Sequence, residues 1–561
     1  EPLYNLGLSL KYQGKTEEAY DFFYKACWNA AWQDAGYYSL AQLSAARGDW
    51  EEALYEIDKS LLRNWHNLRG RHLKAAILRH LGRKDEALAL IEDSLRIDRF
   101  NFGCGFEKYL ITGVEADLKE LLALMRPEAH NYEELALDYA SAGCWEEALM
   151  AAETAIGQNV SGQTMLHYYK SWFLIQLDRK EEALAAIREA EQQLPDCCFP
   201  NVLEAILALQ SVIGFATETP KALYYLGNLW YDKRQYPEAI TCWETSMQQD
   251  DTFPTVLRNL SLAYFNKLNR QEEAVTLLEK AFALDMTDAR ILMELDQLYK
   301  RLNCSHEDRL AFLEKHKDIA FQRDDLYLEY VTLLNQLGQY EEAIRMIDAR
   351  KFHPWEGGEG KVPAQYQLAR VELVKQLLAE KKYEEALALI EECFIYPHNL
   401  GEGKLYGAQE NDFNYYKACA LSGLGRKEEA MELFLAASIG NSQPAAAMYY
   451  NDQKPDKIFY QGLALRKLER EEEARGRFNN LISYGEKHLY DVFKMDYFAV
   501  SLPDLQIWED DMNKKNRIHC NYLMALGHLG LGNNEKAMKY FDIAAEMDNN
   551  HQGVQIHQKM I

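Results

Sequence analysis

The tetrapeptide Gly-Glu-Gly-Lys occurs twice in this chain, at residues 358–361 and 401–404, forty-three residues apart. A Gly-Lys pair in a glycine-rich loop suggests phosphate binding, because backbone amides and a lysine ammonium together can hold a phosphate group. The same tetrapeptide at a regular distance also fits a repeated corner of two neighbouring structural repeats. The residues around each copy distinguish these two interpretations.

The phosphate interpretation fails on residue identity. A phosphate-binding loop requires Gly, four residues, Gly-Lys and then Ser or Thr, between a strand and a helix. Trp355 and His398 occupy the first glycine position, and Val362 and Leu405 replace the hydroxyl residue that would bind magnesium. We therefore predict no nucleotide site at either copy.

The residues of the two segments suit a different ligand. Trp355 and Tyr396 provide flat aromatic surfaces beside glycine and carboxylates, a combination that suits a sugar or a peptide. The candidate polar groups of such a site are Glu356, Glu359, Glu402 and His398, with His353, Lys361 and Lys404 nearby. The alternative is structural: glycine and proline form the turn, and the aromatic rings cover the exposed edge of the helices.

Other catalytic chemistry finds little support. Carboxylate pairs such as Glu356 with Glu359, or Glu410 with Asp412, are expected by chance among 87 acidic residues. The sequence lacks the Cys-x-x-Cys, Gly-x-Ser-x-Gly and His-Glu-x-x-His motifs. Three histidines also lack the spacing of a helical metal pair: His66, His72 and His80. We predict no catalytic residue, metal or cofactor, and a chain that is not itself an enzyme.

Composition limits the partners. The 48% hydrophobic content allows a large core, and the net charge of −25 argues against nucleic acid. The longest apolar run, at 205–216, is too short for a membrane span. Ten scattered cysteines fit free thiols in a reducing compartment, so we predict a cytoplasmic protein. Because the sequence begins at Glu1 without Met, we expect it to be part of a longer polypeptide whose targeting segment is not seen.

Self-similarity is the strongest signal. An acidic-plus-alanine motif such as Glu-Glu-Ala recurs at a basic spacing of 34–35 residues, and one 69-residue interval contains a degenerate copy near Arg309. Such a period predicts a solenoid of stacked helix pairs. The alanines of the motif are Ala19, Ala53, Ala87, Ala148, Ala183, Ala239, Ala274, Ala343, Ala386, Ala430, Ala474 and Ala537.

Each copy contains the parts of an antiparallel helix pair. In the first copy, Gly7 lies on the first helix, Gly14 ends it, and Ala19 and Phe23 line one face of the second helix. This pattern at this period resembles the tetratricopeptide repeat. The resemblance implies an all-α, right-handed superhelical solenoid, with departures at about 100–130, 199–220 and 488–518.

The repeats divide into five predicted blocks. These are regular repeats at 1–100, degenerate and regular repeats at 101–220, regular repeats at 221–350, repeats with long insert loops at 351–487, and an extra helix with a terminal repeat at 488–561. The extra helix is expected to start at Pro503-Asp504, to carry Ile507, Trp508 and Met512 on one face, and to brace the last repeats.

The insert loops are inferred from stretched spacing. From Ala343 onward the alanine interval grows to 43–44 residues, which adds loops at 351–364, 394–411 and 438–455. Because neighbouring repeats place equivalent loops side by side, we expect these loops to form one ridge. A second candidate surface is a row of aromatic residues three positions before the small residue of the first helix, including Tyr224, Tyr415 and Phe459.

These patterns support two functional hypotheses. The first is a scaffold that binds a protein partner, or that docks another domain of its own longer polypeptide. The second is a carbohydrate-binding or glycoside-processing protein in which the loops at 353–361 and 396–412 form part of a glycan site. A weaker resemblance links the two Gly-Glu-Gly-Lys corners to large bacterial proteins with a β-sandwich region ahead of a helical-repeat tail, which would make this chain the tail.

Overall fold

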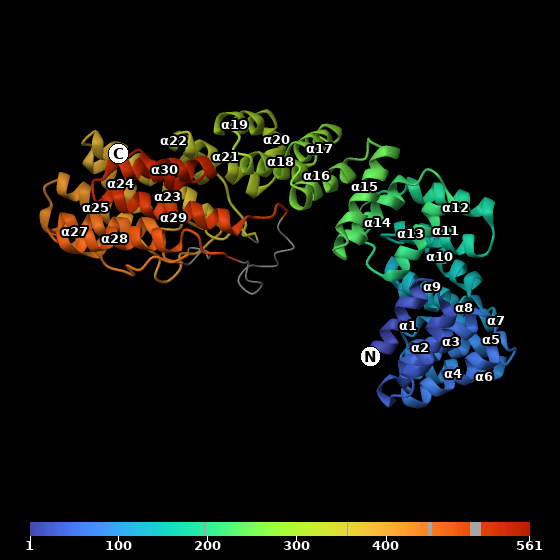
Figure 1. The fold of residues 1–561 in the computed structure, drawn as a ribbon. Helices are drawn as coiled ribbons and strands as arrows, with labels where there is room; N and C mark the ends of the chain where they lie inside the picture. Colours follow the sequence, from blue (N-terminus) through green and yellow to red (C-terminus); the bar gives the residue numbers. More distant parts are fainter. Residues whose placement is uncertain (196–197, 356, 447–451, 494–506) are drawn as a thin grey trace. The chain divides into compact units, whose positions relative to one another are not determined.

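The computed structural model describes residues 1–195, 198–355, 357–446, 452–493 and 507–561. The chain forms two compact units, Glu1–Leu260 (unit 1) and Ser261–Ile561 (unit 2). The described residues form helices and no strand, apart from an isolated bridge between Glu128 and Ser161. This confirms the predicted all-α helical-repeat solenoid (Figure 1). None of the described helices combines the length and the apolar character needed to cross a lipid bilayer.

Unit 1 consists of consecutive antiparallel helix pairs, one 3₁₀ turn and one unpaired helix. Its helices are α1 (Pro2–Tyr12), α2 (Thr16–Ala26), η1 (Ala30–Trp32), α3 (Gln33–Ala46), α4 (Trp50–Arg63), α5 (Leu68–His80), α6 (Lys84–Ile97), α7 (Phe102–Thr112), α8 (Glu115–Met125), α9 (Ala129–Ser141), α10 (Trp145–Gly157), α11 (Thr164–Gln176), α12 (Lys180–Gln192), α13 (Leu203–Phe215), α14 (Pro220–Asp232) and α15 (Tyr236–Gln249).

Unit 2 continues the same arrangement, beginning within α16. Its helices are α16 (Pro254–Leu268), α17 (Gln271–Leu284), α18 (Ala289–Arg301), α19 (His306–Lys315), α20 (Lys317–Ala320), α21 (Asp324–Gln336), α22 (Tyr340–Ala349), α23 (Lys361–Ala379), α24 (Tyr383–Glu392), η2 (His398–Leu400), α25 (Asn411–Gly423), α26 (Lys427–Ser438), α27 (Pro455–Lys467), α28 (Glu471–His488), α29 (Met512–Gly530), α30 (Asn534–Met547) and α31 (Gln552–Gln558).

The two helices of a pair are held together by a small residue that faces a ring. A Cβ atom added at Gly7 would lie 2.7 Å from the ring of Phe23, and one added at Gly462 would lie 2.4 Å from Phe478. The motif alanine lies one turn before that ring and is at most 2% exposed in every copy. Larger residues at these positions would push the helices apart, which explains the small residues of the repeat.

The turn between the two helices has one conformation throughout. The residue five positions before each motif alanine, and Asn303 at the same place in the degenerate copy, has a left-handed φ between +53° and +79°. Glycine adopts this conformation without strain and occupies seven of the positions. Other residues occupy the rest: Asp178, Arg234, Asn269, Asn303, Lys381 and Glu469.

The departures from the period have separate structural causes. In the 69-residue interval, Arg309 of α19 replaces the motif alanine, and its fully buried guanidinium pairs with Asp296 at 2.8 Å and Glu329 at 2.7 Å. In the pair α7/α8, Leu118 stands five positions after the left-handed Gly113, where other copies have the motif alanine, and a Cβ atom added at Gly105 would lie 2.9 Å from Leu121. Helix α13 has no second helix of its own. These three departures lie where the spacing predicted irregular repeats.

The segment before α29 braces unit 2, although not as a helix. Trp508 is 1% exposed, and its indole N–H donates to the carbonyl oxygen of Glu294 at 3.1 Å. Residues 507–511 are non-helical, and α29 begins at Met512, where the Asp511 side chain caps it. The predicted helix start at Pro503 lies outside the described residues, and the prediction that Ile507 and Trp508 are helical is wrong.

The C-terminal residues of unit 2 also return to its earlier helices. Asn550 accepts a hydrogen bond from Arg309 at 2.9 Å and donates to the carbonyl oxygen of Lys300 at 3.0 Å. Gln552 of α31 exchanges side-chain hydrogen bonds with Gln365 of α23 at 2.8–2.9 Å. The last pair of unit 2 is therefore joined to its earlier pairs as well as to its neighbour along the chain.

The turn conformation generates a prediction at Glu469, an exposed residue with a φ of +60°. A non-glycine residue in the left-handed conformation costs roughly 1–2 kcal/mol of stability. Glycine removes this strain but loses more conformational freedom on folding, so the net gain in stability is smaller than the strain. Glu469→Gly should therefore raise the free energy of unfolding by about 0.5 kcal/mol, measured by thermal unfolding. The matched control is Gly425→Ala, where φ is +79° and no atom lies within 4 Å of the added Cβ. It should lower stability by about 1 kcal/mol, and equal effects of the two changes would contradict the strain argument.

Candidate functional site

The insert loops at 351–364 and 394–411 lie against each other in unit 2. The amide of Phe352 donates to the carbonyl oxygen of Asn399 at 2.8 Å, and the Asn399 side chain donates to two carbonyl oxygens at the end of α22, each at 3.0 Å. The Glu402 carboxylate accepts from the amide of Gly360 at 2.7 Å. One glutamate of a Gly-Glu-Gly-Lys corner thus bonds to the backbone of the other corner.

The described part of the third loop joins the same edge. Gln409 accepts from the amide of Lys454 at 3.3 Å, and Asn411 donates to the carbonyl oxygen of Ile439 at 2.8 Å. The predicted neighbourhood of the three loops is therefore confirmed for the residues that the structure describes.

A cavity of about 510 Å³, here called the loop pocket, lies between these loops. Among the predicted residues, Tyr396, Glu359 and Glu402 line it. Trp355 lies in an adjacent hollow of about 280 Å³ together with Glu359 and Glu402, and its ring covers Gly358. His398 lies exposed in η2, and Glu356 lies outside the described residues.

The structure adds residues that were not predicted for this pocket. Leu405 is 60% exposed and Tyr406 is fully exposed, yet both line the loop pocket, with Phe413 deeper inside it. Acidic side chains surround them, and Lys404 pairs with one of these, Glu410. The available sequence signal was an apolar pair within a glycine-rich loop, between Gly403 and Gly407.

A second cavity of about 520 Å³, the groove pocket, adjoins the loop pocket. It is lined by α23, α25, α27 and α29, the first helices of four pairs, and by α31. Its buried Lys457 pairs with Asp412 and Asp456. Burial alone would lower the pKa of Lys457, but the negative charges of the two carboxylates have the larger combined effect and raise it. Lys457 also lines the loop pocket.

The aromatic row lies mostly within the helix pairs. Tyr224 is 8% exposed with its ring 4.9 Å from that of Phe253, and Phe459 is 1% exposed against Phe478. Tyr415 is partly buried against Phe434. Tyr460, one position after Phe459, lines the groove pocket, as does Tyr522 of α29. A binding role for Tyr224, Tyr415 and Phe459 stays a prediction.

Unit 1 has a smaller cavity of about 270 Å³ that is rich in charged groups. Burial lowers the pKa of Lys11 to about 8 and raises the pKa of Asp138 to about 6. Lys11 donates to Gln42 at 2.8 Å, and Tyr12 donates to Glu204 of α13. These polar side chains already have partners within unit 1, and the Tyr12–Glu204 bond connects α1 to α13. We therefore do not take this cavity as the primary candidate site.

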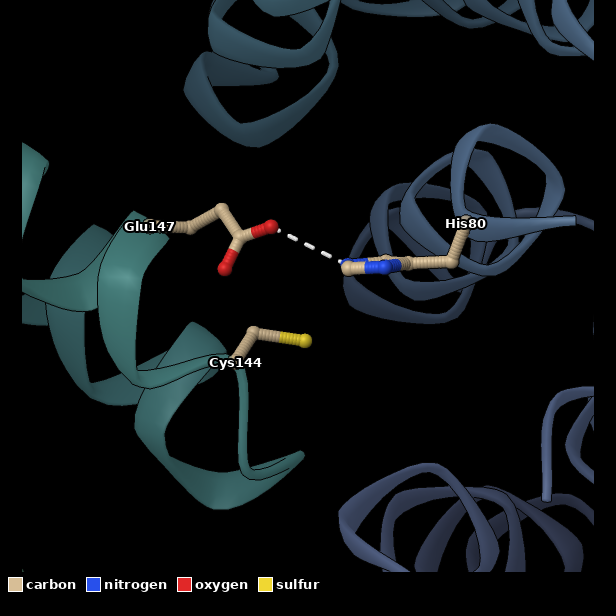
Figure 2. Close-up of side chains that lie close together, drawn as sticks. All are labelled: His80, Cys144 and Glu147. Atoms are coloured by element: carbon tan, nitrogen blue, oxygen red, sulfur yellow. Dashed lines mark ion pairs between the residues drawn. The ribbon is translucent and has the colours of Figure 1, made fainter. Parts of the chain in front are cut away.

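Unit 1 also brings together three side chains from two different repeats. His80 of α5, Cys144 before α10 and Glu147 in the first turn of α10 place their ligating atoms within 4.8 Å of one another (Figure 2). Glu147 also accepts from Arg79 at 2.7 Å. Burial opposes ionisation of this carboxyl, but hydrogen bonds from His80 and Arg79 lower the pKa of Glu147 to about 2.

The groove pocket generates a prediction about pH. His557 of α31 is 1% exposed, its Nδ1 lies 2.7 Å from the carbonyl oxygen of Gly553, and burial followed by the charge of Lys375 lowers its pKa to about 4. The unfolded chain binds this proton at about pH 6.5. Because the unfolded state then holds more protons, the free energy of unfolding should fall by about 1 kcal/mol per pH unit as pH decreases from about 6 to 4.

The measurement is the thermal unfolding midpoint of wild type and His557→Gln between pH 7 and pH 4. The variant should lose part of the acid sensitivity, while the exposed His398→Gln serves as the control and should keep it. The same dependence on pH in His557→Gln and wild type would contradict the assignment.

Comparison with known proteins gives one family match and several structural likenesses. Similar solved structures include a tetratricopeptide repeat protein from Parabacteroides merdae (15% identity, 54% of this chain and 98% of that chain, TM-score 0.23). Others are the P58(IPK) TPR domain (14%, 78% and 98%, TM-score 0.20) and YrrB, described as a TPR protein with an unusual peptide-binding site (15%, 42% and 96%, TM-score 0.16). Residues 133–196 match the tetratricopeptide repeat family. Residues 133–196 are thus a tetratricopeptide repeat segment, and antiparallel helix pairs like those of this segment recur in the described residues of both units.

Proposed function

We propose that this chain is a protein-interaction scaffold whose unit 2 binds an extended segment of a protein partner. The observation that supports this most is the adjacency of the loop pocket and the groove pocket, of about 510 and 520 Å³. They share five lining residues: Ala364, Gln367, Phe413, Lys454 and Lys457. A single peptide can therefore place successive side chains in both, as extended peptides do in pre-formed grooves.

The chemistry of the loop pocket indicates what the peptide carries. Glu359, Glu402 and Glu410 line its walls, and Tyr396 and Tyr406 provide aromatic surface. Carboxylates beside aromatic rings favour a Lys or Arg side chain, through charge pairing and cation–π contact. The exposed Leu405 and Tyr406 are the apolar surface that a partner would cover. We infer a segment with a basic residue next to an apolar one.

The carbohydrate hypothesis has weaker support. A sugar platform needs an aromatic face open to the ligand, and the ring of Trp355 has one face against Gly358. The loop pocket itself is lined by Leu405, Phe413 and two prolines, which favours a peptide with apolar side chains. The peptide hypothesis is therefore the one we carry forward.

The proposal is tested by selecting binders from a random twelve-residue peptide library displayed on phage. Selected peptides should be enriched in Lys or Arg beside aromatic or aliphatic residues, and their affinity should fall with added salt. Tyr406→Ala should weaken binding by about tenfold, as loss of a central aromatic anchor does. Glu359→Lys should weaken it further by repelling the basic residue.

The matched control is Tyr490→Ala, because Tyr490 is another exposed tyrosine of unit 2, at 84% exposure, and it lines neither pocket. It should leave binding unchanged. Selected peptides that bind wild type, Tyr406→Ala and Glu359→Lys equally would overturn the proposal. The proposal would also be overturned if the peptide library gave no binders while a glycan array showed binding that is lost in Tyr406→Ala.

A further inference from the structure

The side chains of His80, Cys144 and Glu147 converge in unit 1, outside the proposed peptide site. The imidazole Nε2 of His80 lies 3.0 Å from a carboxylate oxygen of Glu147, and the Cys144 thiol lies beneath both (Figure 2). All three ligating atoms lie within 4.8 Å of one another. These are a nitrogen, a sulfur and an oxygen donor, a set that suits a divalent transition metal.

Comparison among the chain's own repeats shows that this corner is unusual. In five helix pairs the residue before the second helix is an arginine that pairs with the glutamate three positions later. These pairs are Arg83–Glu86, Arg179–Glu182, Arg270–Glu273, Arg426–Glu429 and Arg470–Glu473. Cys144 stands in the arginine position of α10, and Glu147 is the corresponding glutamate. Here the glutamate is reached by His80 from another repeat.

The surrounding residues hold the three side chains in place. The ring of His80 stacks on Trp50, with centroids 4.1 Å apart and planes 3° apart. Arg79 is a nearby positive charge that would oppose a metal ion. Its guanidinium also donates two hydrogen bonds, at 2.7 and 3.1 Å, to the fully buried carboxylate of Glu107. That carboxylate offsets the arginine charge and keeps the guanidinium fixed.

We propose that His80, Cys144 and Glu147 bind one zinc ion and leave its fourth position to water. Entry is available because the His80 side chain is 27% exposed, whereas Cys144 is 4% exposed and closes the inner side. On binding, the thiol loses its proton to the buffer and a Zn–S bond forms. Glu147 then shares its carboxylate between the ion and Arg79.

The position of the site gives the ion a structural role. His80 ends α5 and Cys144 precedes α10, and the off-period pair α7/α8 lies between these helices in the sequence. A metal bridge would join the regular repeats on either side of the off-period pair. This would stabilise unit 1 at one of the places where the repeat period is broken.

Cobalt(II) is a suitable probe because thiolate coordination produces a near-ultraviolet charge-transfer band. Titration of the full chain should give a saturable band at one Co²⁺ per chain, and Zn²⁺ should displace it and raise the unfolding temperature. Cys144→Ser should abolish the band. The control Cys242→Ser, at a partly exposed cysteine of α15, should keep it.

Two further variants keep the test decisive if Cys144→Ser fails to fold. His80→Gln alters an outer side chain, and Glu147→Gln preserves shape, so circular dichroism should show both folded. Each should weaken zinc binding at least tenfold. A cobalt band that survives Cys144→Ser, unchanged affinity in both other variants, or no saturable binding would overturn the proposal.

Discussion

The architecture depends on how closely the two helices of each pair approach. A ring of the second helix, such as Phe23, Trp243 or Phe478, lies directly against a glycine of the first, where a Cβ atom would come within 2.7 Å. Such contacts bring the two helices of a pair close together, and the motif alanines near them are almost completely buried. The connections between pairs do not take part in this close approach, and the three long loops occur there.

The loops of unit 2 use this framework to build a surface. Asn399 and Glu402 bond to backbone groups of the preceding loop and of α22, so the loops are fixed by polar contacts as well as by their helices. The same arrangement leaves Leu405 and Tyr406 exposed at the pocket. Loops supported in this way can hold apolar groups in water in a defined position, which suits recognition of a partner.

Regular spacing made the repeated features of the fold predictable from the sequence. The helix pairs, the left-handed turns and the neighbouring loops all depend on period and on residue size, which are visible locally. A bracing segment that contains Trp508 was predicted, but its partner was not, and neither was the role of Asn550, because both residues bond to groups more than two hundred positions earlier. His80 and Cys144 were missed for the same reason, since their proximity depends on how α10 lies against α5. Tyr406 was missed because its exposure depends on the loop conformation.

The return of the last residues of unit 2 to its earlier helices affects how the unit comes apart. In an open array of repeats the outermost pair has a neighbour on one side and unravels first. Here Arg309 and Asn550 join α19 to the segment before α31, and Trp508 covers α18. Unfolding of the last helices therefore breaks contacts with α18 and α19, and unfolding of α18 and α19 breaks contacts with the last helices. We therefore expect unit 2 to unfold cooperatively. A partner bound at the loops would then protect amide hydrogens in helices that it does not touch.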